Sequence, residues 1–222
     1  MKTDEPQTAR TGTARDKILT AALSVIRMKG YAATSVDDLC TAAGVTKGAF
    51  FHHFDSKEAL GIAAAKHWSE TTSIFFAEAP YHKHADPLER VLAYIRFRRD
   101  ILQGELAEFT CLVGTMAQET HQTSRAIADA CNAAISGHAA TLDADIAAAM
   151  RDRGLNPDGS ATGWSAASLA LHTQTVLQGA FIIAKARGGP AVAHDSVDHL
   201  ARYVRLLFAS KPDRTRNERP PS

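Results

Sequence analysis

The sequence from Thr34 to Leu60 is TSVDDLCTAAGVTKGAFFHHFDSKEAL, and it predicts two short helices joined by a tight turn. Ser35, followed three residues later by Asp38, has the form of a capping box, so the first helix is expected to begin there. Gly44 is expected to end it, because glycine readily adopts the left-handed conformation found after helices. Thr46 is a suitable N-cap for the second helix. Two helices of this length joined through a glycine are typical of a helix-turn-helix, whose second helix can enter the major groove of DNA.

Helices are also predicted on both sides of this stretch. Apolar residues recur on one face from Arg15 to Lys29, and Gly30 follows as a stop. Long helices are expected over residues 57–78, 86–103, 108–119, 123–153, 166–187 and 194–210, with loops at 154–163 and 188–192. No run alternates apolar with polar residues for long enough to predict a strand. The expected fold class is therefore all-α.

The composition describes a nearly neutral chain of 222 residues, with 25 basic and 24 acidic side chains. That balance does not indicate a nucleic-acid partner, so an argument for DNA binding must rest on local pattern. Cys40, Cys111 and Cys131 are too few and too scattered for a disulfide framework, which favours a reduced protein. The polar start at residues 1–7 argues against a secretory signal, and the richest apolar stretch, Val176 to Ala184, is too short to span a bilayer. We therefore expect a soluble, cytoplasmic protein with no membrane partner.

The opening stretch closely resembles the DNA-binding motif of the TetR family of transcriptional repressors. The resemblance covers about residues 13–62, where the turn glycine, a short recognition helix, Phe54 at its end and the continuation SKEAL at 56–60 occur in order. It implies a homodimer that represses transcription from a near-palindromic DNA operator and is released by a small-molecule inducer. The expected parts of the chain are a flexible arm at 1–12, a helix-turn-helix domain at 13–60, a ligand-binding and dimerisation domain at 61–210, and a disordered tail at 211–222.

The resemblance places the DNA contacts around the turn. Hydroxyl and free backbone N–H groups at a helix N-terminus suit a phosphate, and lysines bring positive charge to the DNA backbone. The candidate contacts are Thr34, Ser35, Thr46, Lys47, Gly48, Ala49, Phe51, His52 and Lys57. Phe51 stands where the family usually has a phosphate-binding tyrosine, and Ala49 stands where threonine is frequent. Arg10 and Arg15 either reach the DNA from the arm or belong to a solvated leader.

The last two long helices, 166–187 and 194–210, are expected by the same resemblance to pair with their copies in a four-helix dimer interface. Their apolar stripes are Leu169, Thr173, Val176, Leu177, Ala180, Phe181 and Ala184 in the first helix and Val197, Leu200, Ala201, Val204, Leu207 and Phe208 in the second. The alternative is that some of these residues pack only inside the monomer.

An inducer pocket, mostly apolar with a few polar groups, is expected between the helices of residues 61–210. The candidate lining residues are Trp68, Phe75, Phe109, Cys111, Met116, Trp164, His172, Gln178 and Phe181. Aromatic and methionine residues at helical spacing are also typical of a plain core, so each residue has both interpretations. No cluster of arginines indicates a strongly anionic inducer, and His172 and Gln178 favour a neutral or weakly polar molecule.

Cys111 supports an alternative, a repressor that senses electrophiles or oxidants through a thiol. The run FTCLVG at 109–114 resembles the corresponding helix of such members of the family, in which a lysine on the penultimate long helix can partner the cysteine. Lys185 is the matching lysine. A nearby ammonium group raises the thiolate fraction of a cysteine, which is the chemistry that such a sensor needs. A buried, inert cysteine is the competing interpretation, and Cys40 and Cys131 are expected in the core.

No metal, cofactor or catalytic site is expected. His82 and His84, like the other histidine pairs, lack the spacing and the cysteine or carboxylate partners of a metal site. The chain contains no HExxH, nucleophile elbow, P-loop or dinucleotide-binding glycine pattern. The remaining alternative is a helical enzyme or carrier with a vestigial helix-turn-helix, which a failure to bind any DNA from its own promoter region would favour.

Overall fold

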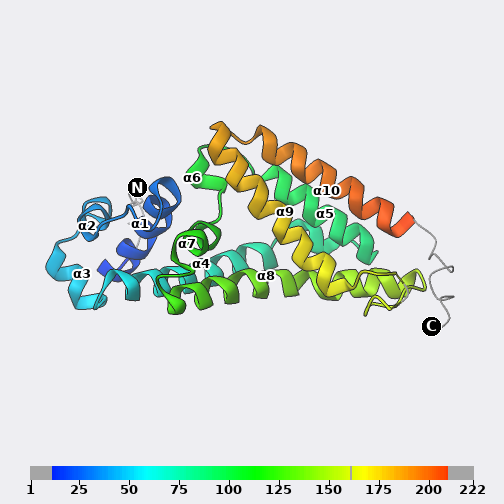
Figure 1. Ribbon diagram of the computed structural model, residues 1–222, viewed down its shortest axis with the longest axis horizontal. Helices are drawn as coiled ribbons and strands as arrows, with labels where there is room; N and C mark the ends of the chain where they lie inside the picture. The colour runs from blue at the N-terminus through cyan, green and yellow to red at the C-terminus, as the bar shows by residue number, and fades with distance from the viewer. Residues whose placement is uncertain (1–11, 161, 210–222) are drawn as a thin grey trace, which may run out of the picture.

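The computed structural model describes residues 12–160 and 162–209, which form helices and loops without a strand (Figure 1). The elements are α1 (Ala14–Lys29), α2 (Val36–Ala43), α3 (Lys47–His53), α4 (Lys57–Ala77), the 3₁₀ helix η1 (Pro80–Lys83), α5 (Pro87–Asp100), α6 (Leu106–Phe109), α7 (Leu112–Thr120), α8 (Arg125–Asp152), α9 (Ala166–Arg187) and α10 (Ala191–Ala209). The predicted all-α class is confirmed. Apart from Gly12, the predicted arm at 1–12 lies outside the described residues, as does the predicted tail at 211–222.

The helices are distributed along one long axis (Figure 1). α1, α2 and α3 lie together at one end, while α9 and α10 pack side by side toward the other end. α4 and α8 pack against each other and run along the molecule between the two ends. Both ends therefore share these two helices.

The three N-terminal helices are closed by residues from much later in the chain. Their buried side chains form one cluster, the N-terminal core, with members from α4, α7 and α8. Its largest fully buried members are Ile18, Leu19 and Ile26 of α1, Leu39 of α2, Phe50 of α3, Leu60 of α4, Leu112 and Met116 of α7, and Ile127 of α8. Burying side chains of this size contributes roughly 1.5–3 kcal/mol each. The position of α1–α3 is therefore fixed by packing against α7 and α8.

A second cluster, the C-terminal core, lies between α5, α8, α9 and α10 and contains most of the stripes predicted for the dimer interface. The buried members are Leu169, Thr173, Leu177, Ala180, Phe181 and Ala184 of α9 and Val197, Leu200, Ala201 and Val204 of α10. Val176, Leu207 and Phe208 are partly buried against the same core. The fully buried residues follow the alternative expectation, because they pack inside the same chain, whereas Val176, Leu207 and Phe208 keep part of their surface exposed. The exposed large apolar side chains of the two helices are Leu171, Ile182 and Ile183 of α9 and Tyr203 and Leu206 of α10.

The predicted helix at 108–119 is divided into α6 and α7. The backbone is extended at Thr110 and Cys111 between them, with ψ values of 158° and 124°. The Cys111 Sγ then accepts a hydrogen bond from the Gly114 N–H at 3.4 Å and caps α7. Cys111, which was predicted in the middle of one helix, is therefore the N-cap of α7.

α9 is long and apolar enough, by length and composition alone, to cross a membrane. The prediction that no stretch could span a bilayer, which rested on Val176 to Ala184, was wrong by this criterion, because the apolar character extends over the whole helix. Of the most apolar 18-residue stretch of α9, 44% is buried, and the helix packs against α8 and α10. α9 therefore buries one side against its own chain and leaves Leu171, Ile182 and Ile183 exposed on the other.

Candidate DNA-binding surface and ligand cavity

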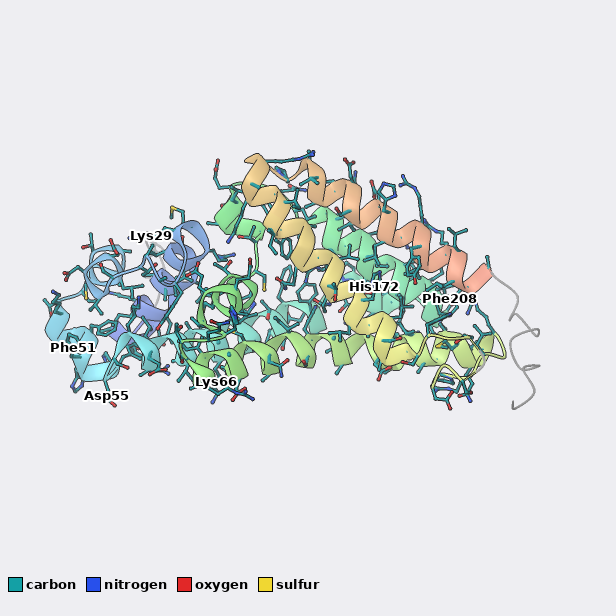
Figure 2. The ribbon with its side chains drawn as sticks, in the orientation of Figure 1. Lys29, Phe51, Asp55, Lys66, His172 and Phe208 are labelled. Carbon is teal, nitrogen blue, oxygen red and sulfur yellow. The ribbon has the colours of Figure 1, made fainter. Side chains whose placement is uncertain are left out.

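The segment from α2 to α3 has the geometry of a helix-turn-helix. Gly44 lies in the left-handed region, with φ 63°, and ends α2. Thr46 caps α3, because its side-chain oxygen accepts a hydrogen bond from the Ala49 N–H at 3.1 Å. Phe50 is completely buried and fixes one face of α3. The next residue, Phe51, packs its ring edge-on against Phe50 with centroids 5.2 Å apart, is 52% exposed and lies at the tip of the molecule (Figure 2).

Most of the predicted DNA contacts lie together on an exposed surface. We define the α3 surface as Ser35, Thr46, Lys47, Gly48, Ala49, Phe51 and His52, all exposed except the half-buried Ala49. A Cβ atom on Gly48 would meet only the Thr46 hydroxyl oxygen, at 3.7 Å. The backbone at Gly48 is therefore open to close approach by another molecule.

Thr34 and Lys57 do not have the free polar groups that the sequence predicted for them. Thr34 is 1% exposed, and its hydroxyl donates to the Gly30 carbonyl oxygen at 2.6 Å. The Lys57 Nζ donates to the carbonyl oxygens of Tyr31 at 3.0 Å and Thr34 at 2.9 Å, and it lies 4.5 Å from the centroid of the Tyr31 ring. The direct phosphate contacts predicted through these side chains are therefore wrong for this structure. Both side chains instead brace the connection from α1 to α2.

Two exposed ion pairs border the α3 surface. The Lys47 Nζ lies 2.8 Å from Asp37 Oδ1, and this hydrogen bond and charge raise the pKa of the lysine. Lys29 lies 2.6 Å from Asp38, and hydrogen bonds from Lys29 and Ser35 hold the pKa of that carboxyl well below its usual range. Exposed pairs of this kind contribute little to stability. Lys47 can therefore exchange Asp37 for a phosphate at small cost.

Two contacts connect the helix-turn-helix end with the rest of the chain. A Glu119 carboxylate oxygen on α7 accepts a hydrogen bond from the Ala32 N–H at 2.7 Å. Arg27 on α1 donates to the Glu108 carbonyl oxygen at 3.2 Å, and its guanidinium lies 5.0 Å from the centroid of the Trp68 ring. These contacts link α1 and the turn that follows it to Trp68 of α4, Glu108 of α6 and Glu119 of α7.

A cavity of about 60 Å³ lies between helices α4 to α9. This is room for a few groups of the size of a water molecule, since one such group needs about 10–15 Å³. Its apolar lining residues are Trp68, Phe76, Phe109, Val113, Ala134, Ile135 and Phe181. Its other lining residues are Ser69, Thr72, Ser73, Arg98, Cys111, His138, Gln174 and Gln178. Of the nine residues predicted to line a pocket, the cavity contains Trp68, Phe109, Cys111, Gln178 and Phe181.

Two of the other predicted lining residues lie on α4 and α7 but face away from the cavity. Met116 is completely buried in the N-terminal core. Phe75 is 48% exposed and packs its ring against Phe97, with centroids 5.5 Å apart. The predictions for both were wrong for this cavity, which Phe76 of α4 and Val113 of α7 line instead.

The last two predicted lining residues belong to other parts of the fold. Trp164 precedes α9 and packs against Phe208, whose ring centroid is 5.4 Å away. His172 lies on the outer face of α9, 5.3 Å from the ring of Tyr203 (Figure 2). The prediction that His172 lines the cavity was wrong, because this residue lies on the side of α9 that faces solvent. His172 therefore adds no polar group to the cavity.

The sequence analysis missed the cavity residues Arg98 and His138. Arg98 belongs to the run RFRRD, whose charges suggest a solvated helix face. Its spacing of four from Tyr94, on the buried face of α5, is the signal that would have placed it inward. His138 lies on α8 in a stretch rich in alanine, where apolar periodicity is weak.

His138 is part of a buried polar network in the cavity wall. Its Nε2 lies 2.9 Å from the Tyr94 hydroxyl, which accepts a hydrogen bond from Gln174 Nε2 at 3.2 Å. Burial, aided by the nearby positive charge of Arg98, lowers the pKa of His138 from 6.5 to about 4. His138 is therefore neutral near pH 7.

The predicted pairing of Cys111 with Lys185 is indirect. The Lys185 Nζ donates to the Thr115 hydroxyl oxygen at 2.7 Å, and burial lowers the pKa of the lysine. Cys111 lies within electrostatic range of both Lys185 and Arg27. Within residues 12–160 and 162–209, no three His, Cys, Asp or Glu side chains gather in a way that could hold a metal ion.

Comparison with known families finds two matching family models. Residues 18–64 match the model described as bacterial regulatory proteins, tetR family, and residues 87–194 match the C-terminal domain of LmrA/YxaF-like transcriptional regulators. The two matches cover the helix-turn-helix and most of the helices around the cavity.

Individual relatives agree with these family matches. The transcriptional regulator AcuR of Cereibacter sphaeroides is 28% identical over 48% of this chain and 48% of its own length. The regulator LmrA of Bacillus subtilis is 30% identical over 55% of this chain and 65% of its own length. The chain thus spans about half to just under two thirds of the length of these relatives.

Solved structures share the fold over nearly the whole chain. A TetR-family regulator from Agrobacterium tumefaciens has a TM-score of 0.72 at 21% identity and covers 86% of this chain and 96% of its own. The TetR-family regulator CifR, as a cysteine mutant complexed with 26-bp operator DNA, has a TM-score of 0.67 at 21% identity over 94% of this chain and 100% of its own. At these identities the likeness concerns the fold.

Proposed function

Because the chain belongs to the TetR family of transcriptional regulators, we propose that it is a cytoplasmic, non-enzymatic repressor that binds a near-palindromic operator as a homodimer. A small molecule bound in the cavity would release it from the DNA. The observation that carries the proposal is the exposed α3 surface, held at the tip of the molecule by a capped helix on a buried Phe50.

The α3 surface supports binding in the major groove. Lys47 supplies a positive charge beside the N-terminus of α3, and the open backbone at Gly48 allows close approach to base edges. Ala49 offers a methyl group to a thymine methyl. Phe51 has no hydroxyl, so it contributes ring packing to the sugar-phosphate backbone without the hydrogen bond that a tyrosine would donate.

The exposed apolar face of α9 supports dimerisation. Leu171, Ile182 and Ile183 are 51%, 44% and 45% exposed, although large apolar side chains usually avoid water. A two-fold axis beside α9 would cover this face with its own copy and hold two α3 helices about one turn of DNA apart. This face replaces the buried stripes as the proposed interface.

Contacts around Arg27 support coupling between the cavity and the DNA. Trp68 and Phe109 line the cavity, while Arg27 stacks on Trp68 and donates to the carbonyl of Glu108. A ligand that displaces these walls would move α1, and with it the angle of α3. The operator would be released because the ligand binds the conformation with displaced α3 helices more tightly than the conformation that binds DNA.

A DNA-binding measurement tests the proposal. The full chain should bind a fragment of its own promoter region at a stated salt concentration, and Lys47→Ala should weaken binding roughly tenfold by removing a phosphate contact. Lys66→Ala is the matched control, because Lys66 is also exposed and ion-paired, to Glu70, but lies on α4. No binding to any such fragment would contradict repression and favour a helical enzyme or carrier.

Thiol sensing through Cys111 is a second candidate function. The observation that favours it is the position of Cys111 as the cap of α7 and in the cavity lining, where an electrophile held in the cavity would meet the sulfur. Alkylation followed by mass spectrometry tests this. A rate for Cys111 in the folded protein no faster than in a denatured sample would rule the candidate out, and buried Cys131 is the internal control.

A further inference from the structure

The cavity contains one arginine without a partner. The Nε of Arg98 is buried and has no hydrogen-bond partner, and among the described residues no carboxylate pairs with its guanidinium. The other arginines of α5 do not share this property. Their partners are Asp145 for Arg90, Glu89 for Arg96, and Asp198 for Arg99.

Aromatic rings hold the Arg98 side chain in place. The guanidinium carbon lies 5.0 Å from the centroid of the Phe76 ring and 6.0 Å from that of Phe181. Such contacts stabilise a cation and leave the N–H groups at its edge available for hydrogen bonds. Arg98 as a residue is half-buried, and because a buried N–H group without a hydrogen bond is costly, a partner supplied from outside the chain is the simplest account of its Nε.

The rest of the cavity lining is suited to a molecule with one negative charge. The lining includes no aspartate or glutamate, and His138 beside Arg98 is neutral. The side-chain amide of Gln178 has no hydrogen-bond partner within the described part of the chain and adds a second unused donor. The remaining walls are mainly aromatic and aliphatic, including Trp68 and Phe109.

We propose that the cavity binds a small organic monocarboxylate. The carboxylate accepts two parallel hydrogen bonds from Arg98, since the planar guanidinium matches its geometry, and the apolar body packs between Trp68, Phe109 and Phe181. This inference rests on the proposed function in one respect, that the inducer occupies this cavity. The expectation of a neutral or weakly polar inducer rested on His172 and Gln178, of which His172 lies outside the cavity and Gln178 lines it beside Arg98.

Ligands with the same body and different charge test the proposal. Benzoate, benzamide and benzylamine share one ring and carry a negative, a neutral and a positive head group. Linear acids from acetate to octanoate and their amides extend the series in size. Titration calorimetry on the full chain should show at least one carboxylate binding roughly tenfold or more tightly than its amide, with no binding of the amine.

Substitutions at Arg98 assign that preference to the arginine. Arg98→Met keeps the length and apolar stem, and we expect it to raise the Kd of the carboxylate by roughly 10- to 100-fold while leaving that of the amide unchanged. Arg98→Lys keeps the charge without the planar fork and should bind with intermediate affinity. Arg96→Met is the matched control on α5 and should not change either Kd. If circular dichroism shows that Arg98→Met is unfolded, Arg98→Lys decides the test.

Three results would overturn the proposal: no carboxylate in the series binds, an amide binds as tightly as its acid, or the folded Arg98 variants bind the acid like the wild type. Promoter binding without ligand is measured in parallel. If the chain binds promoter DNA and no carboxylate, the ligand class is wrong and the repressor function stands. If it binds a carboxylate through Arg98 and no promoter DNA, the ligand class holds and the repressor function fails.

Discussion

His138 is a neutral side chain in the cavity wall, and its low pKa makes folding depend on pH. The pKa is about 4 in the folded protein because of burial and the charge of Arg98, against 6.5 when the ring is free. Between these values the unfolded chain binds a proton that the folded chain does not. This contribution therefore lowers the free energy of unfolding as pH falls, by about 2 kcal/mol from pH 7 to pH 5. Urea unfolding of wild type and His138→Gln at both pH values measures it.

The difference in pH dependence between wild type and His138→Gln measures the contribution of His138 alone, because the other titrating groups are the same in both. His138→Gln keeps a polar partner for Tyr94 and removes the proton, so its advantage over wild type should grow toward pH 5. The same substitution at exposed His121 is the control. Identical pH slopes for wild type and His138→Gln would show that the ring is already solvated and protonated in the folded state.

Single residues differ in how much of their role the sequence reveals. Gly44, Thr46 and Phe50 were predictable, because caps, turns and apolar spacing depend on neighbours in the chain. The spacing of Arg98 from Tyr94 predicts that Arg98 faces inward, but the missing partner of its Nε and the carbonyl contacts of Lys57 were not predictable, because both depend on distant groups.

At the scale of the elements, Glu119 ties α7 to the turn after α1 through the Ala32 N–H. Glu119→Ala should lower the free energy of unfolding by about 0.5–1 kcal/mol, because a hydrogen bond to a charged acceptor is lost at an exposed site. It should also weaken operator binding, since the turn that carries α2 is released. Faster hydrogen exchange at the Ala32 amide in the variant would show the loss of this hydrogen bond directly.

A matched substitution separates this contact from loss of charge in general. Glu70→Ala removes an exposed glutamate of α4, whose partner Lys66 is 3.9 Å away, and should change neither exchange at Ala32 nor operator binding. Unchanged exchange at Ala32 in Glu119→Ala would mean that the turn is held by Lys57 and Thr34 alone.

Elements with ordinary caps were predicted well, and the division between α6 and α7 was not. α4 and α9 begin at serines and α5 at an aspartate, which are typical N-caps. α7 begins at Cys111, whose thiol is an unusual cap, and apolar residues continue across the break. Local pattern therefore gave the number of long helices, but it joined two that the structure separates.

At the scale of the whole molecule, the exposed face of α9 predicts the oligomeric state. Ile182→Glu would place a charge in the proposed two-fold interface, so we expect the dimer to dissociate and operator affinity to fall by at least an order of magnitude. Size-exclusion chromatography with light scattering measures the mass. Ile74→Glu is the control, because Ile74 is 62% exposed on α4 and should leave the dimer intact. A dimer that survives Ile182→Glu would place the interface elsewhere.

A chimaera that joins α1–α3 of this protein to the body of another regulator would inherit an incomplete interior. The N-terminal core is closed by Leu112 and Met116 of α7 and Ile127 of α8, far along the chain from the proposed DNA contacts of α3. A transplant cut near residue 60 would therefore expose that interior, however well the side chains of the α3 surface were preserved. Substituting side chains such as Lys47 and Ala49 on the existing scaffold would leave that interior closed.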